Sequence, residues 1–154
     1  MSRALELKIM PMPLAVLVAA AMWALASAFP GLTIALPLHG SIALLLLLSG
    51  LVCVFGSALV FRRKRTTLDP RQPEQAATLL TGGLFRISRN PIYLGFLLLL
   101  LAWFEYLANL AALPLLPAFV LYLNRFQIIP EERALAERFG DAYLDYCKRV
   151  RRWL

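Results

Sequence analysis

Three groups of residues on this chain have types and spacings that could support chemistry. The first is the segment 81–95, with the sequence TGGLFRISRNPIYLG. Its two glycines free the backbone for close approach to a ligand, and Asn90 followed by Pro91 predicts the start of a helix. A helix N-terminus carries free amide groups and partial positive charge, so an anionic carboxylate could dock there. The same pattern is also compatible with a plain helix start flanked by interfacial anchors.

The second group is Glu131 and Glu132, which follow Pro130. Acidic residues in the first turn of a helix are favourable through the helix dipole alone. Just beneath a membrane core, however, a charge is expensive unless it is paired, so the two carboxylates could instead bind a cationic ligand. Both interpretations stay open at this point.

The third group is the segment 139–146, FGDAYLDY, followed one turn later by Arg149. Tyr143 and Tyr146 either pack the apolar face of a helix or offer their rings to a sulfonium through cation–π attraction. A metal site is not expected, because His39 is the only histidine and Cys53 and Cys147 have no metal-ligand spacing. The two cysteines also cannot found a disulfide scaffold.

The elements that must position these groups are transmembrane helices. Of the 154 residues, 60% are hydrophobic, and a soluble domain this short could not bury so much apolar surface. A spanning helix needs roughly 20 predominantly apolar residues. We predict an all-α integral membrane protein, formed by residues 1–154 as a single domain. Its four spans are expected at about 13–29, 41–61, 91–108 and 110–128, with Pro114 and Pro117 bending the last.

The basic residues predict the orientation of these spans. All 16 lysines and arginines precede the first predicted span, lie in the loop 62–90, or lie at and beyond the end of the fourth span. This distribution follows the positive-inside rule. Both termini and the loop 62–90 are therefore expected in the cytoplasm, and Arg62 and its basic neighbours are expected at anionic headgroups rather than on nucleic acid. Residues 3–28 imitate a signal peptide, but we interpret them as leading into the first span.

The segment 130–153 is predicted to form cytoplasmic amphipathic helices. Its apolar residues have spacings of three and four, and Gly140 followed by Asp141 predicts a stop and a new start. Such helices lie along the membrane surface or fold back under the bundle. The apolar positions are Leu135, Phe139, Tyr143, Tyr146, Val150 and Trp153.

Together these motifs resemble the isoprenylcysteine carboxyl methyltransferase family and, more loosely, the membrane phospholipid N-methyltransferases. The resemblance rests on the GLF and RNPIYLG segments at 83–85 and 89–95, on the glutamate pair, and on Phe139-Gly140 with its two tyrosines. It covers roughly residues 41–154. The family's motif has histidine where this chain has Asn90, and asparagine keeps a hydrogen bond but cannot carry charge.

The resemblance implies an S-adenosylmethionine site at the cytoplasmic end of the bundle, with S-adenosylhomocysteine as the product. Glu131 or Glu132 would hold the ammonium group of the cofactor, and Arg133 or Arg149 would pair with a substrate carboxylate. If the acceptor were an amine, Glu131 or Glu132 would be the candidate base. The expected pocket is lined by Gly83, Leu84, Asn90, Pro91, Tyr93, Tyr143 and Tyr146.

The resemblance predicts methyl transfer to a lipophilic acceptor that enters from the bilayer, most simply a carboxylate of an isoprenoid-type or other amphiphilic molecule. Three alternatives remain: a phospholipid or amine N-methyltransferase, an NADPH-dependent membrane reductase of related fold, and a non-enzymatic small transporter or scaffold. Four-span exporters normally need an ionisable residue within a span, and the apolar runs used here have none. The bacterial inner membrane is the expected location. The oligomeric state is not predicted.

Overall fold

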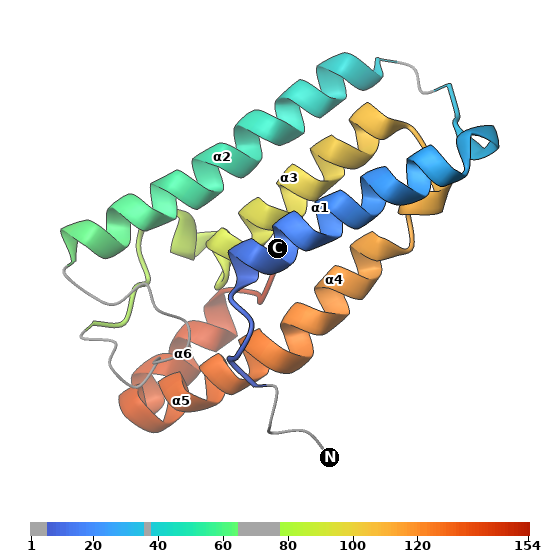
Figure 1. Cartoon of the computed structure of the whole chain (residues 1–154). Coiled ribbons are helices and arrows are strands. Elements are labelled where there is room, and N and C mark those ends of the chain that lie inside the picture. Colours follow the sequence, from blue (N-terminus) through green and yellow to red (C-terminus); the bar gives the residue numbers. More distant parts are fainter. Residues whose placement is uncertain (1–5, 36–37, 65–77) are drawn as a thin grey trace.

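The computed structural model describes residues 6–35, 38–64 and 78–154, and in these ranges the chain is helical and contains no β-strand. Figure 1 shows the helices of residues 11–63 and 91–128 side by side, with those of residues 129–149 at one end. The α-helices are α1 (Pro11–Ala28), α2 (His39–Arg63), α3 (Pro91–Leu107), α4 (Leu115–Leu123), α5 (Ile129–Phe139) and α6 (Asp141–Arg149). The short turns are η2 (Pro30–Leu32), η4 (Gly83–Arg86), η5 (Leu110–Ala112) and the π-helical η6 (Asn124–Ile128).

Three helical segments are long and apolar enough to cross a membrane: Pro11–Ala28, His39–Arg63 and Leu110–Phe139. The last comprises η5, α4, η6 and α5 in succession. α3 is apolar but has only 17 residues. The prediction of an all-α membrane protein is thus confirmed, whereas the limits of the four spans relative to the bilayer stay a prediction. α3 also contains Glu105, so one ionisable residue does lie inside a helix that was treated as uncharged.

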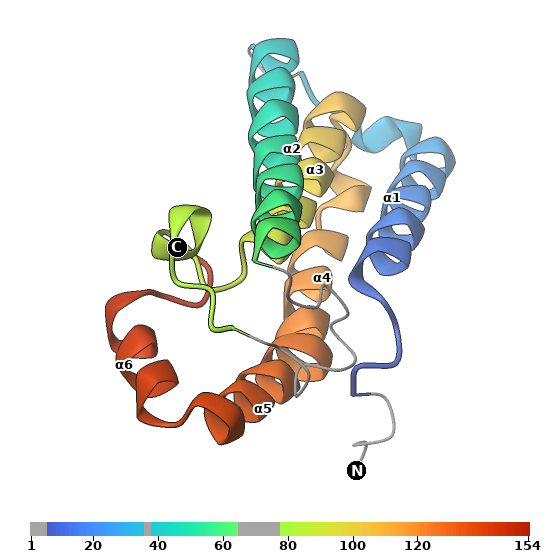
Figure 2. The same ribbon diagram turned by 90° about the vertical axis from the view of Figure 1, so that its left-hand side faces the viewer.

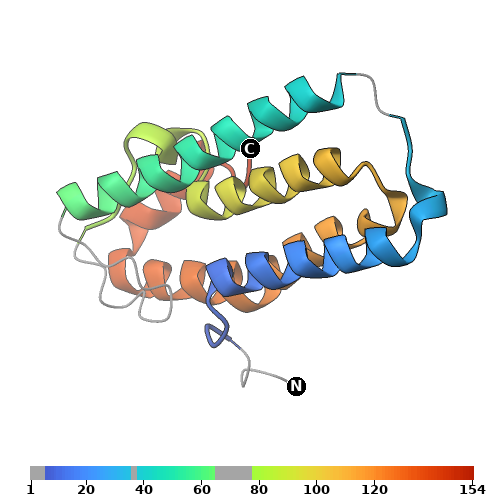
Figure 3. The same ribbon diagram turned by 45° about the horizontal axis from the view of Figure 1, so that its top comes forward.

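α3 is the central helix of the bundle, with α2 along one side and α1 and α4 on the other (Figure 3). α2 and α3 approach closely where Gly50 and Gly95 face each other. A Cβ atom added at Gly95 would lie 2.7 Å from Cγ2 of Val54 and 2.9 Å from the carbonyl oxygen of Gly50. Small residues allow such close approach, which drives helix association where the hydrophobic effect is absent. This contact sets where the start of α3 lies relative to α2.

A buried asparagine organises the turn between α3 and α4. The Asn109 amide nitrogen donates to the Phe29 carbonyl oxygen at 2.9 Å and to the Thr33 hydroxyl at 3.1 Å. Its side-chain oxygen accepts the Ala111 amide at 3.0 Å. Because a buried polar group must find partners, these bonds hold the α1–α2 and α3–α4 connections together at this end. The predicted loop residue His39 is already the first residue of α2.

The other end of the bundle carries the short helices. α4 continues through the π-helical η6 into α5, and Gly140, at a φ of +52°, separates α5 from α6. A positive φ is easy for glycine, so the sharp change of direction occurs there, and Gly140 rather than Asp141 occupies the position before α6. The buried face of α6 packs with Leu80 and Phe85, and with Val60 and Phe61 of α2. The C-terminal helices therefore fold back under the bundle (Figure 2).

Candidate active site

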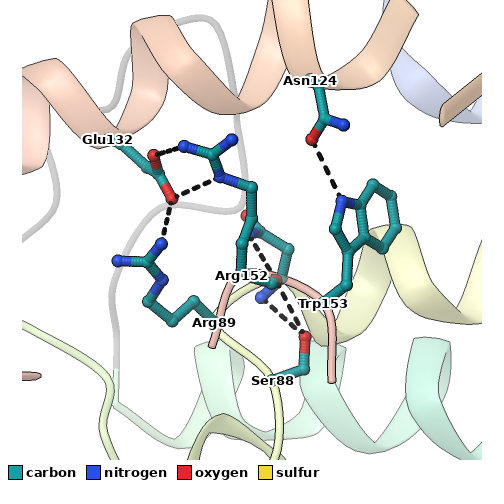
Figure 4. Close-up of polar contacts among 7 residues, drawn as sticks. Ser88, Arg89, Asn124, Glu132, Arg152 and Trp153 are labelled. Carbon is teal, nitrogen blue, oxygen red and sulfur yellow. Dashed lines mark hydrogen bonds and ion pairs between the residues drawn. The ribbon is translucent and has the colours of Figure 1, made fainter. Parts of the chain in front are cut away.

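Polar side chains from four segments converge where α3 begins and α5 begins. These segments are residues 88–90 before α3, the first turn of α5, η6, and residues 150–154, which we call the C-terminal strap. The strap follows α6 and returns to the start of α3, where the Arg89 amide donates to the Arg151 carbonyl oxygen at 3.0 Å. Figure 4 shows the contacts within this polar cluster.

Glu132 lies between two guanidinium groups. Its Oε1 forms an ion pair with Arg89 Nη2 at 2.9 Å and accepts from Arg152 Nε at 3.1 Å, and its Oε2 accepts from Arg152 Nη2 at 2.6 Å. The pair with Arg152 is bidentate, the geometry in which arginine binds carboxylates most strongly. The exposed fractions are 14% for the Arg89 side chain, 18% for Glu132 and 36% for Arg152. The three side chains together carry one net positive charge.

Glu131 has a different partner. The Tyr93 hydroxyl donates to its Oε2 at 2.9 Å, and Tyr93 is 6% exposed in the core of the bundle. This bond connects the first turn of α3 with the first turn of α5. Within the part of the chain that the structure describes, no arginine or lysine forms an ion pair with Glu131, in contrast to Glu132.

Asn90 precedes Pro91, the first residue of α3, but its side chain does not cap the helix. Its Nδ2 donates to the Arg152 carbonyl oxygen at 3.0 Å, and the Ser88 hydroxyl donates to the same oxygen at 3.3 Å. The predicted helix start at Asn90-Pro91 is confirmed, with Asn90 at the N-cap position, but the side-chain amide of Asn90 is used by the strap. The last strap contact runs from Trp153 Nε1 to Asn124 Oδ1 in η6 at 3.0 Å (Figure 4).

Tyr143 and Tyr146 are each 4% exposed and pack in the cluster beneath α2. The Tyr146 hydroxyl donates to the Phe85 carbonyl oxygen at 2.7 Å. Burial raises the pKa of Tyr146 to about 12. Burial, and next the negative charge of Glu132, raise the pKa of Tyr143 well above its ordinary value. Both rings are thus neutral near pH 7, and Tyr143 lies close enough to Glu132 to respond to its charge.

The other predicted pocket residues lie near the cluster without a polar role of their own. Gly83 has a φ of +61° in η4, and nothing lies within 4 Å of the position its Cβ would take. The Leu84 side chain contacts Gly56 of α2, where a Cβ would lie 3.0 Å from Leu84 Cδ1. Pro91 is buried.

The structure does not bring Arg133 and Arg149 to this cluster. The Arg133 side chain is 47% exposed and lies 3.7 Å from Glu6 Oε2. Arg149 is exposed, and its Nε donates to the Asp145 carbonyl oxygen at 3.2 Å within α6. Arg89 and Arg152 are the arginines that lie in the cluster, where each pairs with Glu132 of α5.

Sequence reasoning assigned no role to five residues of the cluster. A signal was present for Trp153 alone, because the apolar periodicity of the C-terminal segment extends to it. For the contact with η6 no local pattern was available. The five residues are Ser88, Arg89, Asn124, Arg152 and Trp153.

Among residues 6–35, 38–64 and 78–154, no group of three or more histidine, cysteine, aspartate or glutamate side chains could hold a metal ion. Cys53 and Cys147 are both free thiols. The absence of a resident metal stays a prediction.

Comparison with known proteins places this arrangement in context. A family model described as phospholipid methyltransferase matches residues 38–142. A curated Haemophilus influenzae protein, described only as uncharacterized, is 48% identical over 63 residues, which are 41% of this chain and 100% of that protein. No solved structure shows a significant match to the chain. The matched region begins just before α2 and ends at the start of α6.

Proposed function

Because this chain belongs to the phospholipid methyltransferase family, we propose that it is a membrane enzyme that moves a methyl group from S-adenosylmethionine to the carboxylate of an amphiphilic, isoprenoid-type lipid. The observation that carries the proposal is that two kinds of group lie close to the start of α3. One is Glu131, a carboxylate without an ion pair among the described residues, and the other is the pair of guanidinium groups of Arg89 and Arg152. The donor set fits the amino-acid end of the cofactor, which has one ammonium and one carboxylate group.

Glu131 is the proposed partner of the cofactor's ammonium group. Its carboxylate is oriented by Tyr93, and no basic side chain of the described residues is paired with it, so its remaining oxygen is available to an ammonium group. When bound, S-adenosylmethionine supplies a sulfonium methyl group as the electrophile. The enzyme's contribution is to position the two reactants and exclude water, and position alone accounts for a large part of the acceleration in such displacements.

Arg89 is the proposed partner of anionic groups. Arg89 and Arg152 share one carboxylate, Glu132, which leaves one positive charge uncompensated, and the Arg89 Nε is buried without a hydrogen-bond partner among the described residues. A buried donor without a partner costs free energy, so an acid that reaches this nitrogen would be bound favourably. An acceptor carboxylate carries the negative charge that this positive charge attracts, whereas a protonated amine would be repelled.

A phospholipid amine is the second candidate acceptor. The family description favours it, and Glu131 would then serve as the base that frees the lone pair of the amine. The two acceptors differ in product: a methyl ester releases methanol in alkali, whereas an N-methyl group is stable. Incubation with methyl-labelled S-adenosylmethionine and either a prenylated thioether acid or phosphatidylethanolamine, followed by alkali, separates them.

The enzyme class is tested with ligands alone. S-adenosylhomocysteine should raise the melting temperature of the detergent-solubilised protein, because a ligand that binds only the folded state stabilises it, by about 2.7 kcal/mol at one hundred times Kd. NADPH, assayed in parallel, should have no effect. A rise in melting temperature with NADPH and none with millimolar S-adenosylhomocysteine would favour the reductase over the methyltransferase. If neither ligand changes the melting temperature, the transporter or scaffold is favoured.

A further inference from the structure

The structure separates the two adjacent glutamates, which occupy one helical turn but have different partners. Glu131 binds a neutral phenol of α3, and Glu132 binds two cations, one of which belongs to the C-terminal strap. A carboxylate that already accepts two hydrogen bonds from Arg152 and forms an ion pair with Arg89 has little capacity left for a third cation. This asymmetry allows the two carboxylates to be assigned different tasks.

The strap is held by apolar packing and by polar contacts. Val150 is buried in the cluster beneath α2, and Trp153 packs against the core of the bundle. The Arg151 carbonyl oxygen accepts from Arg89, the Arg152 carbonyl oxygen accepts from Ser88 and Asn90, and the Trp153 indole donates to Asn124. The Arg152 side chain adds an ion pair that connects the strap to α5. The bidentate pair with Glu132 is the strongest of these contacts.

We propose that Glu132 is a positioning residue: through Arg152 it holds the C-terminal strap against the start of α3, and it leaves Glu131 as the carboxylate that meets the cofactor's ammonium group. The proposal rests on the proposed function for its ligand. It predicts that Arg152 assists cofactor binding by keeping the strap, Asn90 and Arg89 in place.

If Glu132 had the alternative task, removal of Arg152 would change the Kd for the cofactor in the opposite direction. If Glu132 met the ammonium group directly, Arg152 would compete for the same carboxylate, and its removal would strengthen binding. Replacing Arg152 by glutamine therefore distinguishes the two tasks by the direction of the change in Kd and not by its size alone.

The experiment measures S-adenosylhomocysteine affinity of the full-length, detergent-solubilised protein by calorimetry, together with amide hydrogen exchange of residues 150–154. Arg152→Gln should weaken binding by about 3- to 10-fold and accelerate exchange of the strap, since one charge-assisted pair is lost. Glu132→Gln should accelerate the same exchange, and the double variant should bind no more weakly than Glu132→Gln, because both changes remove one contact. Glu131→Gln should weaken binding by roughly 10- to 150-fold with strap exchange unchanged.

Controls exclude a general loss of structure. Arg151→Gln removes a neighbouring exposed arginine and should leave both affinity and exchange unchanged, and Arg152→Lys should restore part of the lost affinity. Tighter or unchanged binding in Arg152→Gln would overturn the proposal. If the wild-type protein does not bind S-adenosylhomocysteine at all, the proposed function fails, whereas the exchange data still decide whether Glu132 and Arg152 hold the strap.

Discussion

At the scale of single residues, Asn90 shows how a position can keep its place in a motif and change its partner. The isoprenylcysteine carboxyl methyltransferase family, which the motif resembles, has histidine at this position, and the histidine ring titrates near neutral pH. In this chain the asparagine amide donates to the Arg152 carbonyl oxygen, a contact that needs a donor and no charge. The departure from the motif is therefore compatible with a role in holding the strap.

Tyr93→Phe is a direct test of the Glu131 environment. The change removes the only hydroxyl donor shown for this carboxylate and should reduce the free energy of unfolding by about 1.5–3 kcal/mol, the range for hydrogen bonds to charged groups. Thermal or denaturant unfolding in detergent provides the measurement. Tyr106→Phe is the matched control, because Tyr106 is 70% exposed and its change should be within about 0.5 kcal/mol of wild type. Equal stabilities of the two variants would contradict the assignment.

At the scale of elements, the site depends on where helices begin and bend. The π-helical η6 lies between α4 and α5, and such turns occur frequently at functional sites. In this chain η6 supplies Asn124 for Trp153 and the Phe126 carbonyl oxygen, which accepts the Leu7 amide at 2.9 Å. One turn therefore contacts both the strap and the segment before α1.

The α2–α3 contact should tolerate no added side chain. Gly95→Ala would place a Cβ against Val54 and the backbone of Gly50, and backbone cannot move as a flexible side chain does. We expect a loss of about 1–3 kcal/mol of stability from overpacking. Because the contact sets the start of α3, cofactor binding should weaken as well.

The control is Gly40→Ala, in the first turn of α2, where nothing lies within 4 Å of the new atom. This change should be neutral or stabilising by about 0.5–1 kcal/mol, since alanine is the better helix former. Thermal unfolding of both variants in the same detergent decides the matter. A Gly95→Ala protein as stable as Gly40→Ala would mean that the two helices can separate without cost.

At the scale of the whole molecule, the end segments lie at the same end of the bundle. The segment before α1 and the C-terminal strap both bind η6, and this end also holds α5 and α6 (Figure 2). The turn with Asn109 lies at the opposite end. An even number of crossings is the simplest arrangement consistent with these positions.

Reporter fusions test the predicted orientation. A green fluorescent protein fused after Leu154 should fluoresce, and alkaline phosphatase fused there should be inactive, because the basic residues predict a cytoplasmic C-terminus. Alkaline phosphatase fused after Leu110, in the turn that follows α3, should be active. An active phosphatase after Leu154 would reverse the topology and place the polar cluster outside the cytoplasm.

The sequence by itself determined the fold class and the elements. Hydrophobic runs, the Asn90-Pro91 pair and Gly140 act over a few neighbouring residues, so their consequences can be predicted locally: apolar helices, the start of α3 at Pro91 and the break before α6. The motif residues also predicted a site at the end of the bundle where α3 begins, and this site stays a proposal. The roles of individual site residues remain proposals.

Only the tertiary structure decided which charges meet. Arg89, Glu132 and Arg152 lie on three separate segments, and periodicity along one helix says nothing about partners on another. Their contacts depend on the close approach at Gly50 and Gly95, the π-helical turn and the reversal at Gly140. Arg133 and Arg149 carry the same charge as Arg89 and Arg152, and they are near Glu132 and Arg152 in the sequence. Their side chains nevertheless contact Glu6 and the Asp145 carbonyl oxygen. The physical reason is that ion pairs are selected by distance in space, which packing sets.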